Sequence, residues 1–448
     1  MGRTIASEEA AGASTVTFGE ALRVWLKIGC LGFGGPAGQI ALMHRMLVDE
    51  RKWIDEARFL HALNFCMLLP GPEAQKLATY VGWLLHGTRG GLAAGILFVL
   101  PGALVMLGMS FLYVLGRGVP VVDGALFGIK AAVLVIVVEA LIRIGRRSLR
   151  TGLLIVLAGV AFVGIFFFDA PFPLIVAGAA VLGFFVARAS PGLLGLQAPA
   201  AAPVAAADGQ WGRAAAMTAV GLVLWWAPVA MAVAMLGADH VFADIGVFFS
   251  KLAVVSFGGA YALLAYMAQE AVETYRWMTA PEMVDGLGLA ETLPGPLIKI
   301  TQFVGFLGAY RDAAPFTPAT AGLLGSALTT WVTFVPPMLL IFVAAPFIEQ
   351  LRSNRRLSGA LAAITAAVVG VILNLTVWFA LHVLFAEVNE AHAGPLRWYA
   401  FDPSTADPVV SALALVAAVL AFGLHRSLVE LILIMTALGI AVKWVLGV

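Results

Sequence analysis

Charged residues are scarce in this chain, and that scarcity decides its class. Asp, Glu, Lys and Arg make up 12% of the 448 residues, against about a quarter in ordinary soluble domains. Hydrophobic residues make up 61%, and the mean hydropathy is +0.96. Apolar runs of about 20 residues, the length of a helix that crosses a bilayer, recur from end to end. The composition excludes a soluble globular protein and predicts an all-α polytopic membrane protein, with the lipid bilayer as its surroundings.

Other absences restrict the function. Both cysteines, Cys30 and Cys66, lie in apolar runs, which argues against a disulfide framework or a thiolate metal site. The seven histidines show no metal-ligand spacing, so we expect no metal and no cofactor. The motifs H-E-x-x-H and G-x-S-x-G and paired intramembrane aspartates are missing, which argues against a membrane-embedded enzyme. The sequence has no G-x-x-x-x-G-K-[ST] motif, so this chain alone is not expected to use ATP. A net charge of +1 without a basic tail gives no reason to expect nucleic acid.

The sequence contains an internal repeat. An offset of 224 residues brings several motifs into register, and after an insertion near Arg311 the offset becomes 235. The first offset aligns Phe18 with Phe242, Lys27 with Lys251, Phe33-Gly34-Gly35 with Phe257-Gly258-Gly259, Trp53 with Trp277, and Leu69-Pro70-Gly71-Pro72 with Leu293-Pro294-Gly295-Pro296. The second aligns Gly124 with Gly359 and Ala131 with Ala366. The chain is therefore interpreted as a duplication.

Arginine clusters predict the orientation, because cytoplasmic loops are enriched in Lys and Arg. They occur at 143–150 and 352–356, whereas 169–171, 237–244 and most of 387–407 are acidic and predicted to lie outside. The expected spans are 18–43, 59–86, 90–115, 123–143, 152–168, 172–187, 216–236, 245–268, 283–309, 318–348, 358–385, 409–424 and 427–446. About 13 spans result, in two six-span halves joined by one span. The odd central span places the second half upside-down, with the N-terminus in the cytoplasm. The segments 59–86 and 283–309 remain open between broken crossings and re-entrant hairpins.

The domain prediction follows from this arrangement. It comprises a cytoplasmic tail (1–17), a first membrane repeat (18–190), a linker with a connecting span (191–244) and a second, inverted repeat (245–448). Inverted repeats with broken helices in matching positions are typical of secondary transporters, which bind substrate near the midplane between the repeats. A structural scaffold would give no reason for such matched breaks.

Each Pro-Gly-Pro motif breaks a helix, because proline lacks the backbone N–H and clashes with the preceding turn. We expect Pro70, Gly71 and Pro72 to face Pro294, Gly295 and Pro296, with Pro72 and Pro296 opening the second half-helices. The N-terminus of a helix carries about half a positive charge and unpaired N–H donors, so two of them would suit an anion. Gly34-Gly35 and Gly258-Gly259 either contact substrate or pack closely against neighbouring helices.

Polar residues near the breaks complete the candidate site. Two lysines and one acid fall near each break, a surplus of positive charge in a region where each charge is costly. The candidates for substrate binding are Gln75, Lys76, Lys299 and Gln302, and those for charge or proton coupling are Lys27, Lys251, Glu73 and Glu291. Alternatively, Lys76 pairs with Glu73 one turn away, and Lys27 extends to the cytoplasmic interface. Gln39 is a further uncharged donor, and the role of Lys130 is open.

With these residues identified, the chain resembles the chromate transporter family in its long two-domain form, from about residue 18 onward. Lys299 stands where the family pattern has an apolar residue, and His44 where it has Arg or another polar residue. The matching motifs are Phe33-Gly34-Gly35-Pro36, Arg51-Lys52-Trp53, Leu69-Pro70-Gly71-Pro72-Glu73-Ala74-Gln75, Tyr80-Val81-Gly82-Trp83, Ser256-Phe257-Gly258-Gly259-Ala260-Tyr261, the run from Gly286 to Pro296, and Gln302-Phe303-Val304-Gly305-Phe306.

The resemblance implies export of chromate from the bacterial cytoplasm across the inner membrane, with sulfate as the look-alike anion. A dianion leaving an inside-negative cell gains about 4.6 kcal/mol per 100 mV, which favours export, and proton antiport is a further expectation. Uptake of sulfate or another anion is the alternative. A homodimer is one candidate assembly.

Overall fold

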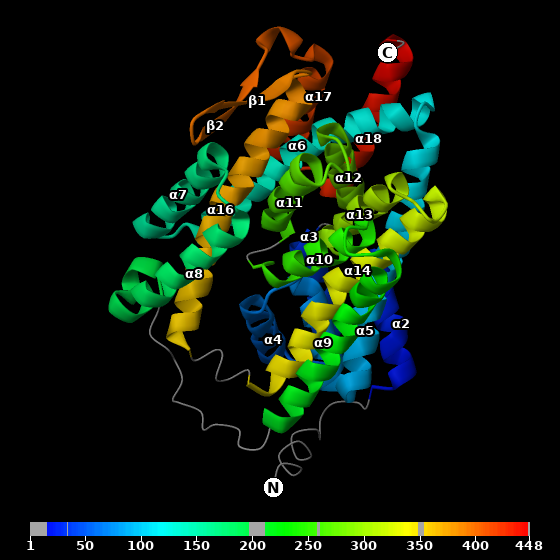
Figure 1. Ribbon diagram of the computed structural model, residues 1–448. Coiled ribbons are helices and arrows are strands. Elements are labelled where there is room, and N and C mark those ends of the chain that lie inside the picture. The colour runs from blue at the N-terminus through cyan, green and yellow to red at the C-terminus, as the bar shows by residue number, and fades with distance from the viewer. Residues whose placement is uncertain (1–15, 34, 197–210, 258–259, 348–353, 447–448) are drawn as a thin grey trace.

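The computed structural model describes residues 16–33, 35–196, 211–257, 260–347 and 354–446. Within this part of the chain, seven helices are long and apolar enough to cross a membrane. In Figure 1 the helices of the chain form an elongated bundle. Helix α2 lies in its lower part, and a β-hairpin and the end of α18 lie at its top. The protein is thus a helical, multi-pass membrane protein.

The first part of the chain contains helices α2 (Phe18–Leu31), α3 (Gly35–His44), α4 (Glu56–Leu68), α5 (Glu73–Gly116), α6 (Pro120–Ser148), α7 (Gly152–Phe168), α8 (Phe172–Ala189) and α9 (Trp211–Leu236). A π-helical turn, η1 (Arg45–Glu50), extends α3, and a 3₁₀ turn, η2 (Pro191–Leu194), follows α8. Helices α6 to α9 agree with the predicted spans to within a few residues, because each is a long apolar run bounded by proline, glycine or arginine.

The second part contains helices α10 (Val241–Val254), α11 (Ala260–Gln269), α12 (Ala280–Thr292), α13 (Ile300–Arg311), α14 (Pro318–Ala344), α16 (Arg355–Leu384), α17 (Pro408–Ala418) and α18 (Leu428–Leu446). Short turns are η3 (Glu270–Thr274), η4 (Leu297–Lys299), η5 (Ala345–Phe347), η6 (Pro403–Thr405) and η7 (Val419–Gly423). Strands β1 (Val388–Ala393) and β2 (Leu396–Phe401) pair antiparallel. The expectation of an entirely helical protein missed this hairpin.

The segment 59–86 is a hairpin rather than a straight broken helix. The rings of Phe65 and Tyr80 lie 5.2 Å apart, whereas fifteen residues of continuous helix would separate them by about 22 Å. The corresponding pair of helices in the second half, α12 and α13, folds back in the same way: a Cβ atom added to Gly286 would lie 2.5 Å from the ring of Phe303. Of the two alternatives left open by the sequence, the structure therefore has the hairpin.

Helix α5 also reverses its direction within its length. His86 and Gly87 have non-helical backbone angles, and Gly87 has a φ of +61°. The arms 73–85 and 88–116 pack against each other, since a Cβ atom added to Gly82 would lie 2.5 Å from Gly90 O. The matching arms in the second half are α13 and α14, which are joined by a longer loop. Only the second arm of α5 is thus a full-length crossing helix.

The predicted single spans 18–43 and 245–268 are hairpins as well. Arg51 Nη1 lies 2.8 Å from Glu20 Oε1, so the far ends of α2 and of α3 with η1 are adjacent. In the second half, the ring of Phe248 on α10 lies 5.7 Å from Tyr266 on α11. A continuous helix would place the residues of each pair more than about 25 Å apart. Four of the expected crossings are thus replaced by short helices that turn back.

The two parts of the chain interlock through their long helices. Helices α6 and α16 correspond at the 235-residue offset. Helix α6 packs against α17 and α18 of the second part. In the same way, α16 packs against α7 and α8 of the first part. The α6–α18 contact is close enough to require glycine, since a Cβ atom on Gly128 would lie 1.9 Å from Met435 O. Neither part therefore buries its long helices by itself.

The hairpin at Pro-Gly-Pro is testable by cross-linking. In a Cys30→Ser, Cys66→Ser background, Phe65→Cys with Tyr80→Cys is expected to form an intramolecular disulfide or to react with a short bis-maleimide. The measurement is proteolysis between the two positions followed by non-reducing electrophoresis. Each single-cysteine variant is the control for links between molecules. Two separate fragments under non-reducing conditions would show that the segment runs straight.

Candidate functional site

The first break lies between α4 and α5, at Leu69-Pro70-Gly71-Pro72. Gly71 has a φ of +104°, a conformation that L side chains rarely adopt. Its N–H donates to Ser256 O across 3.0 Å. Ser256 directly precedes the Phe257-Gly258-Gly259 motif, between α10 and α11. The break in one part of the chain is therefore bonded to the helix interruption in the other.

The second break repeats this geometry with the two parts exchanged. Gly295 has a φ of +93°, and its N–H donates to Gly32 O across 2.9 Å. The 224-residue offset pairs Gly71 with Gly295 and Gly32 with Ser256. We call these two hydrogen bonds the reciprocal contact. Each Pro-Gly-Pro motif thus meets the helix interruption of the opposite part. That the two motifs face each other stays a prediction.

Close packing supports each break from behind. A Cβ atom on Gly71 would lie 2.5 Å from Pro337 Cγ on α14, and one on Gly102 of α5 would lie 2.4 Å from Pro294 O. Gly102 and Pro337 correspond at the 235-residue offset. Both breaks therefore rest on the same repeat position, each on the long helix of the opposite part of the chain.

Lys76 and Lys299 are buried, each 1% exposed, and both are bound to backbone carbonyls at the breaks. Lys76 Nζ donates to Leu69 O. Lys299 Nζ donates to Ala290 O at 2.8 Å and to Leu293 O at 3.2 Å, with Gly295 O and Pro296 O at 3.3 and 3.4 Å. The expected pairing of Lys76 with Glu73 does not account for this position of the amine. Each lysine instead satisfies carbonyls freed where a helix ends.

The two lysines are not aligned in the repeat, yet they reach the same carbonyl. The 224-residue offset pairs Lys76 with Ile300 and Lys299 with Gln75, whereas Leu69 and Leu293 correspond. The carbonyl of this leucine therefore requires a buried donor in both parts of the chain, and neighbouring positions supply it.

Three buried glutamines fix further backbone groups near the breaks. Gln39 Nε2 donates to Gly295 O at 2.7 Å, Gln75 Nε2 to Phe334 O at 3.0 Å and Gln302 Nε2 to Ala103 O at 2.9 Å. Among the residues that the structure describes, the Oε1 atom of each glutamine has no hydrogen-bond partner. The amide nitrogens thus brace the hairpins.

The other sequence candidates lie in different surroundings. Lys27 and Lys251 are exposed on α2 and α10, and Glu73 is half-buried at the start of α5. Glu291 is buried, 5% exposed, and accepts a hydrogen bond from Tyr261. Gly35 begins α3 with a φ of +67°. Gly34, Gly258 and Gly259 lie outside the described residues.

Each break lies beside the ends of two helices. Helices α4 and α12 direct their C-terminal carbonyls at the breaks, and the lysine amines neutralise these partial negative charges. The first N–H groups of α5 point to the same region, behind its N-cap Pro72. In the second part, Pro296 is followed by the turn η4 before α13 begins, so the helix opens later than predicted. Helix N–H groups and two buried lysine amines are therefore both found at the breaks.

Sequence reasoning missed a buried ionic network beside the second break. Asp285 on α12 is 1% exposed. Its Oδ2 accepts from Tyr113 at 2.9 Å and lies 3.3 Å from Arg117 Nη2, and its Oδ1 lies 3.2 Å from Lys130 Nζ. This network ties α12 to α5 and α6 and gives Lys130 a structural role. A charge in an apolar helix was the available signal, but its partners are more than 150 residues away in sequence.

Comparison with known proteins finds related transporters. The family model described as chromate transporter matches residues 19–184 and 243–442. A chromate transport protein of Pseudomonas aeruginosa is 34% identical over 357 residues, 78% of this chain and 77% of that protein. The chromate transport protein of Cupriavidus metallidurans is 29% identical over 366 residues, 80% and 82% of the two chains. An uncharacterized transporter of Methanocaldococcus jannaschii is 26% identical over 362 residues, 80% and 83%. No solved structure gives a significant match.

The role of Lys299 predicts the effect of removing its amine. Lys299→Met leaves several buried carbonyls without a donor, and each such group costs about 1–3 kcal/mol. We expect a clear fall in the thermal midpoint of the detergent-solubilised protein, measured by the loss of monodisperse protein on heating. Lys251→Met is the matched control at an exposed position, where substitutions change stability by about 0.5 kcal/mol or less. Equal midpoints for the two variants would contradict this role.

Proposed function

This chain belongs to the chromate transporter family, and we propose that it is a secondary transporter that exports chromate from the cytoplasm across the bacterial inner membrane. Sulfate-like tetrahedral oxyanions are the further substrates in this proposal. The reciprocal contact is the observation that carries it. Two chain breaks, each with a buried lysine beside it, are bonded across the two parts of the chain.

The proposed binding site is the region between the two breaks. It comprises the glycines and prolines of both motifs, the N-terminal turns of α5 and α13, and the amides of Gln75 and Gln302. Lys76 and Lys299 act there through their charge, because their N–H groups already donate to carbonyls. Positive potential from helix ends and buried amines would hold an oxyanion without requiring a titratable ligand.

The proposed mechanism is alternating access by two inverted repeats, residues 18–190 and 245–448, connected through 191–244. In this arrangement the N-terminus is cytoplasmic and the two repeats rock about the midplane. The membrane potential drives a dianion outward with about 4.6 kcal/mol per 100 mV, and proton antiport adds to this force. A homodimer is a separate hypothesis on which this mechanism does not depend.

Uptake of sulfate or another anion is the second candidate function. It would have to oppose the same electrical term and so would need several coupled cations. Chromate resistance separates the two functions: cells that express the gene are expected to grow at chromate concentrations that stop cells without it. Unchanged resistance together with faster sulfate accumulation would favour uptake.

The placement of the site is tested by enlarging the glycines of the breaks. Gly71→Leu and Gly295→Leu force a side chain onto a positive φ, and at Gly71 also against Pro337. Chromate uptake into everted membrane vesicles, normalised to folded protein, is expected to fall at least tenfold for each variant. Gly178→Leu on α8, where a Cβ atom meets nothing within 4 Å, is the matched control. Undiminished transport by folded Gly71→Leu and Gly295→Leu protein would refute this placement.

A further inference from the structure

A buried arginine on the β-hairpin gathers three carboxylates from different elements. Arg397 on β2 is 2% exposed. Its Nη1 lies 3.0 Å from Asp169, which follows α7, 3.0 Å from Glu390 on β1 and 3.6 Å from Glu273 on η3. Its Nη2 donates to Ile165 O at 2.9 Å. This carboxylate cluster joins the end of α7, the η3 turn and the β-hairpin.

The charges of the cluster do not balance. One guanidinium faces three acids, so full ionisation leaves two surplus negative charges in a partly buried site. Three carboxylates that all lie within 3.6 Å of one guanidinium nitrogen repel one another, and this repulsion favours protonation of one of them. Glu273 is the farthest of the three from the guanidinium, and its side chain is the least exposed, 27% against 35% for Glu390 and 55% for Asp169. Glu273 is therefore the acid that most readily takes up a proton.

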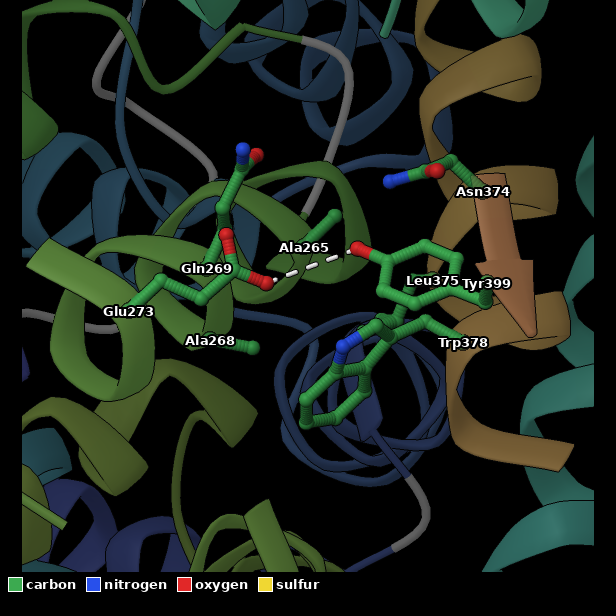
Figure 2. A pocket seen from close by; sticks show the side chains of 8 residues that line it. All are labelled: Ala265, Ala268, Gln269, Glu273, Asn374, Leu375, Trp378 and Tyr399. Carbon is green, nitrogen blue, oxygen red and sulfur yellow. Dashed lines mark hydrogen bonds between the residues drawn. The ribbon is translucent and has the colours of Figure 1, made fainter. Parts of the chain in front are cut away.

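A small pocket beside the cluster provides a second, independent observation. Glu273, Gln269, Asn374, Trp378 and Tyr399 contribute to its lining, as Figure 2 shows. Asn374 on α16 is 7% exposed, and its Oδ1 has no hydrogen-bond partner among the described residues. Tyr399 already donates its hydroxyl to Glu273 Oε1 at 3.4 Å. The pocket thus holds a buried acceptor that lacks a donor, on the far side of the Tyr399 hydroxyl from the Glu273 carboxylate.

A metal ion does not fit this site. Among the described residues, no group of three or more His, Cys, Asp or Glu side chains is arranged to hold one. The Arg397 guanidinium occupies the centre of the carboxylate cluster. A proton is the cation that reduces the surplus negative charge without displacing the guanidinium.

We propose that Glu273 is the loading site for the coupling proton of this transporter, on the side of the membrane that β1 and β2 face, with Arg397 as the residue that positions it. This inference rests on the anion export proposed above. A proton that binds Glu273 removes its attraction to Arg397 and so loosens η3 from the β-hairpin. Helix α11 continues from η3 to the Gly258-Gly259 interruption, which follows Ser256 of the reciprocal contact. The loading site therefore lies at one end of α11. The helix interruption that is bonded to the first break precedes the other end.

Several charged and titratable groups surround the Glu273 carboxyl group. Burial is the largest influence, and together with the nearby Glu390 and Asp169 carboxylates it raises the pKa of Glu273 to about 7, against the opposing effects of Arg397 and the Tyr399 hydroxyl. Glu270 lies on the same turn. His382 of α16 lies beside Tyr399, with the ring centroids 6.2 Å apart. Glu273 therefore changes its protonation between the pH values on the two sides of a respiring membrane.

Transport under a pH gradient tests the coupling. Everted vesicles are prepared with a lumen one pH unit more acidic than the medium, and valinomycin with potassium clamps the potential. For one coupled proton, the gradient changes the equilibrium chromate ratio by about tenfold. Glu273→Gln is expected to abolish this change, and Tyr399→Phe to move the midpoint of the pH profile upward. Glu387→Gln, at an exposed position on the same segment, is the control and retains the wild-type response.

The outcomes separate this inference from the proposed function. A full gradient response in Glu273→Gln protein, or a response to a sodium gradient in place of the proton gradient, would overturn the loading site and leave anion export intact. Absence of chromate flux in the wild-type vesicles would instead overturn the proposed function.

Stability against pH then tests Glu273 without transport. The raised pKa means that its protonated form favours the folded state, so wild-type stability falls between about pH 4.3, the unfolded value, and about pH 7. The stability of the Glu273→Gln protein should fall less than that of the wild type over this pH range. Equal slopes of stability against pH for the two proteins would contradict the assignment.

Discussion

The need to satisfy backbone hydrogen bonds inside a bilayer shapes the centre of this protein. A Pro-Gly-Pro turn frees carbonyl and N–H groups, and inside a bilayer such groups persist only where protein or a water-filled cavity satisfies them. Here buried lysines bind the carbonyls, and the interruption of the opposite part accepts from the glycine N–H. Breaking the reciprocal contact would leave buried groups unpaired at about 1–3 kcal/mol each. Rocking of the two parts is therefore expected to pivot on these bonds.

Backbone symmetry and side-chain asymmetry coexist at the breaks. Gly71 and Gly295 make equivalent bonds, and Gly102 and Pro337 support them at equivalent positions. The side chains differ, since Lys76 approaches its carbonyl from one position further along the chain than Lys299. The position equivalent to Asp285 also differs in chemistry, because the 224-residue offset places His61 there. A duplicated backbone thus fixes where each break contacts the opposite part, while the polar side chains around the two breaks differ.

The repeat offset predicted which residues are equivalent, since the motifs can be aligned from the sequence itself. It did not predict that each break would bond to the helix interruption of the opposite part. It did not predict the direction of the chain after each break, because an apolar run has the same composition in a crossing helix and in a hairpin. Lys76 and Lys299 were recognised as buried charges, but only coordinates reveal that carbonyls hold them. Arg397 stood out as the basic residue in an acidic segment, and its partners Asp169 and Glu273 come from distant elements. Long-range contacts of this kind leave no trace in periodicity.

Replacing crossings by hairpins leaves the proposed inversion intact. A hairpin returns to the side from which it enters, so α2 with α3 and α4 with the first arm of α5 contribute no net crossing. Between them and α10 lie the second arm of α5, α6, the α7–α8 pair and α9. The α7–α8 pair returns the chain to its starting side, so an odd number of crossings separates the two repeats. The proposed inversion therefore depends on α9, because this single connecting helix makes the number of crossings between the two repeats odd.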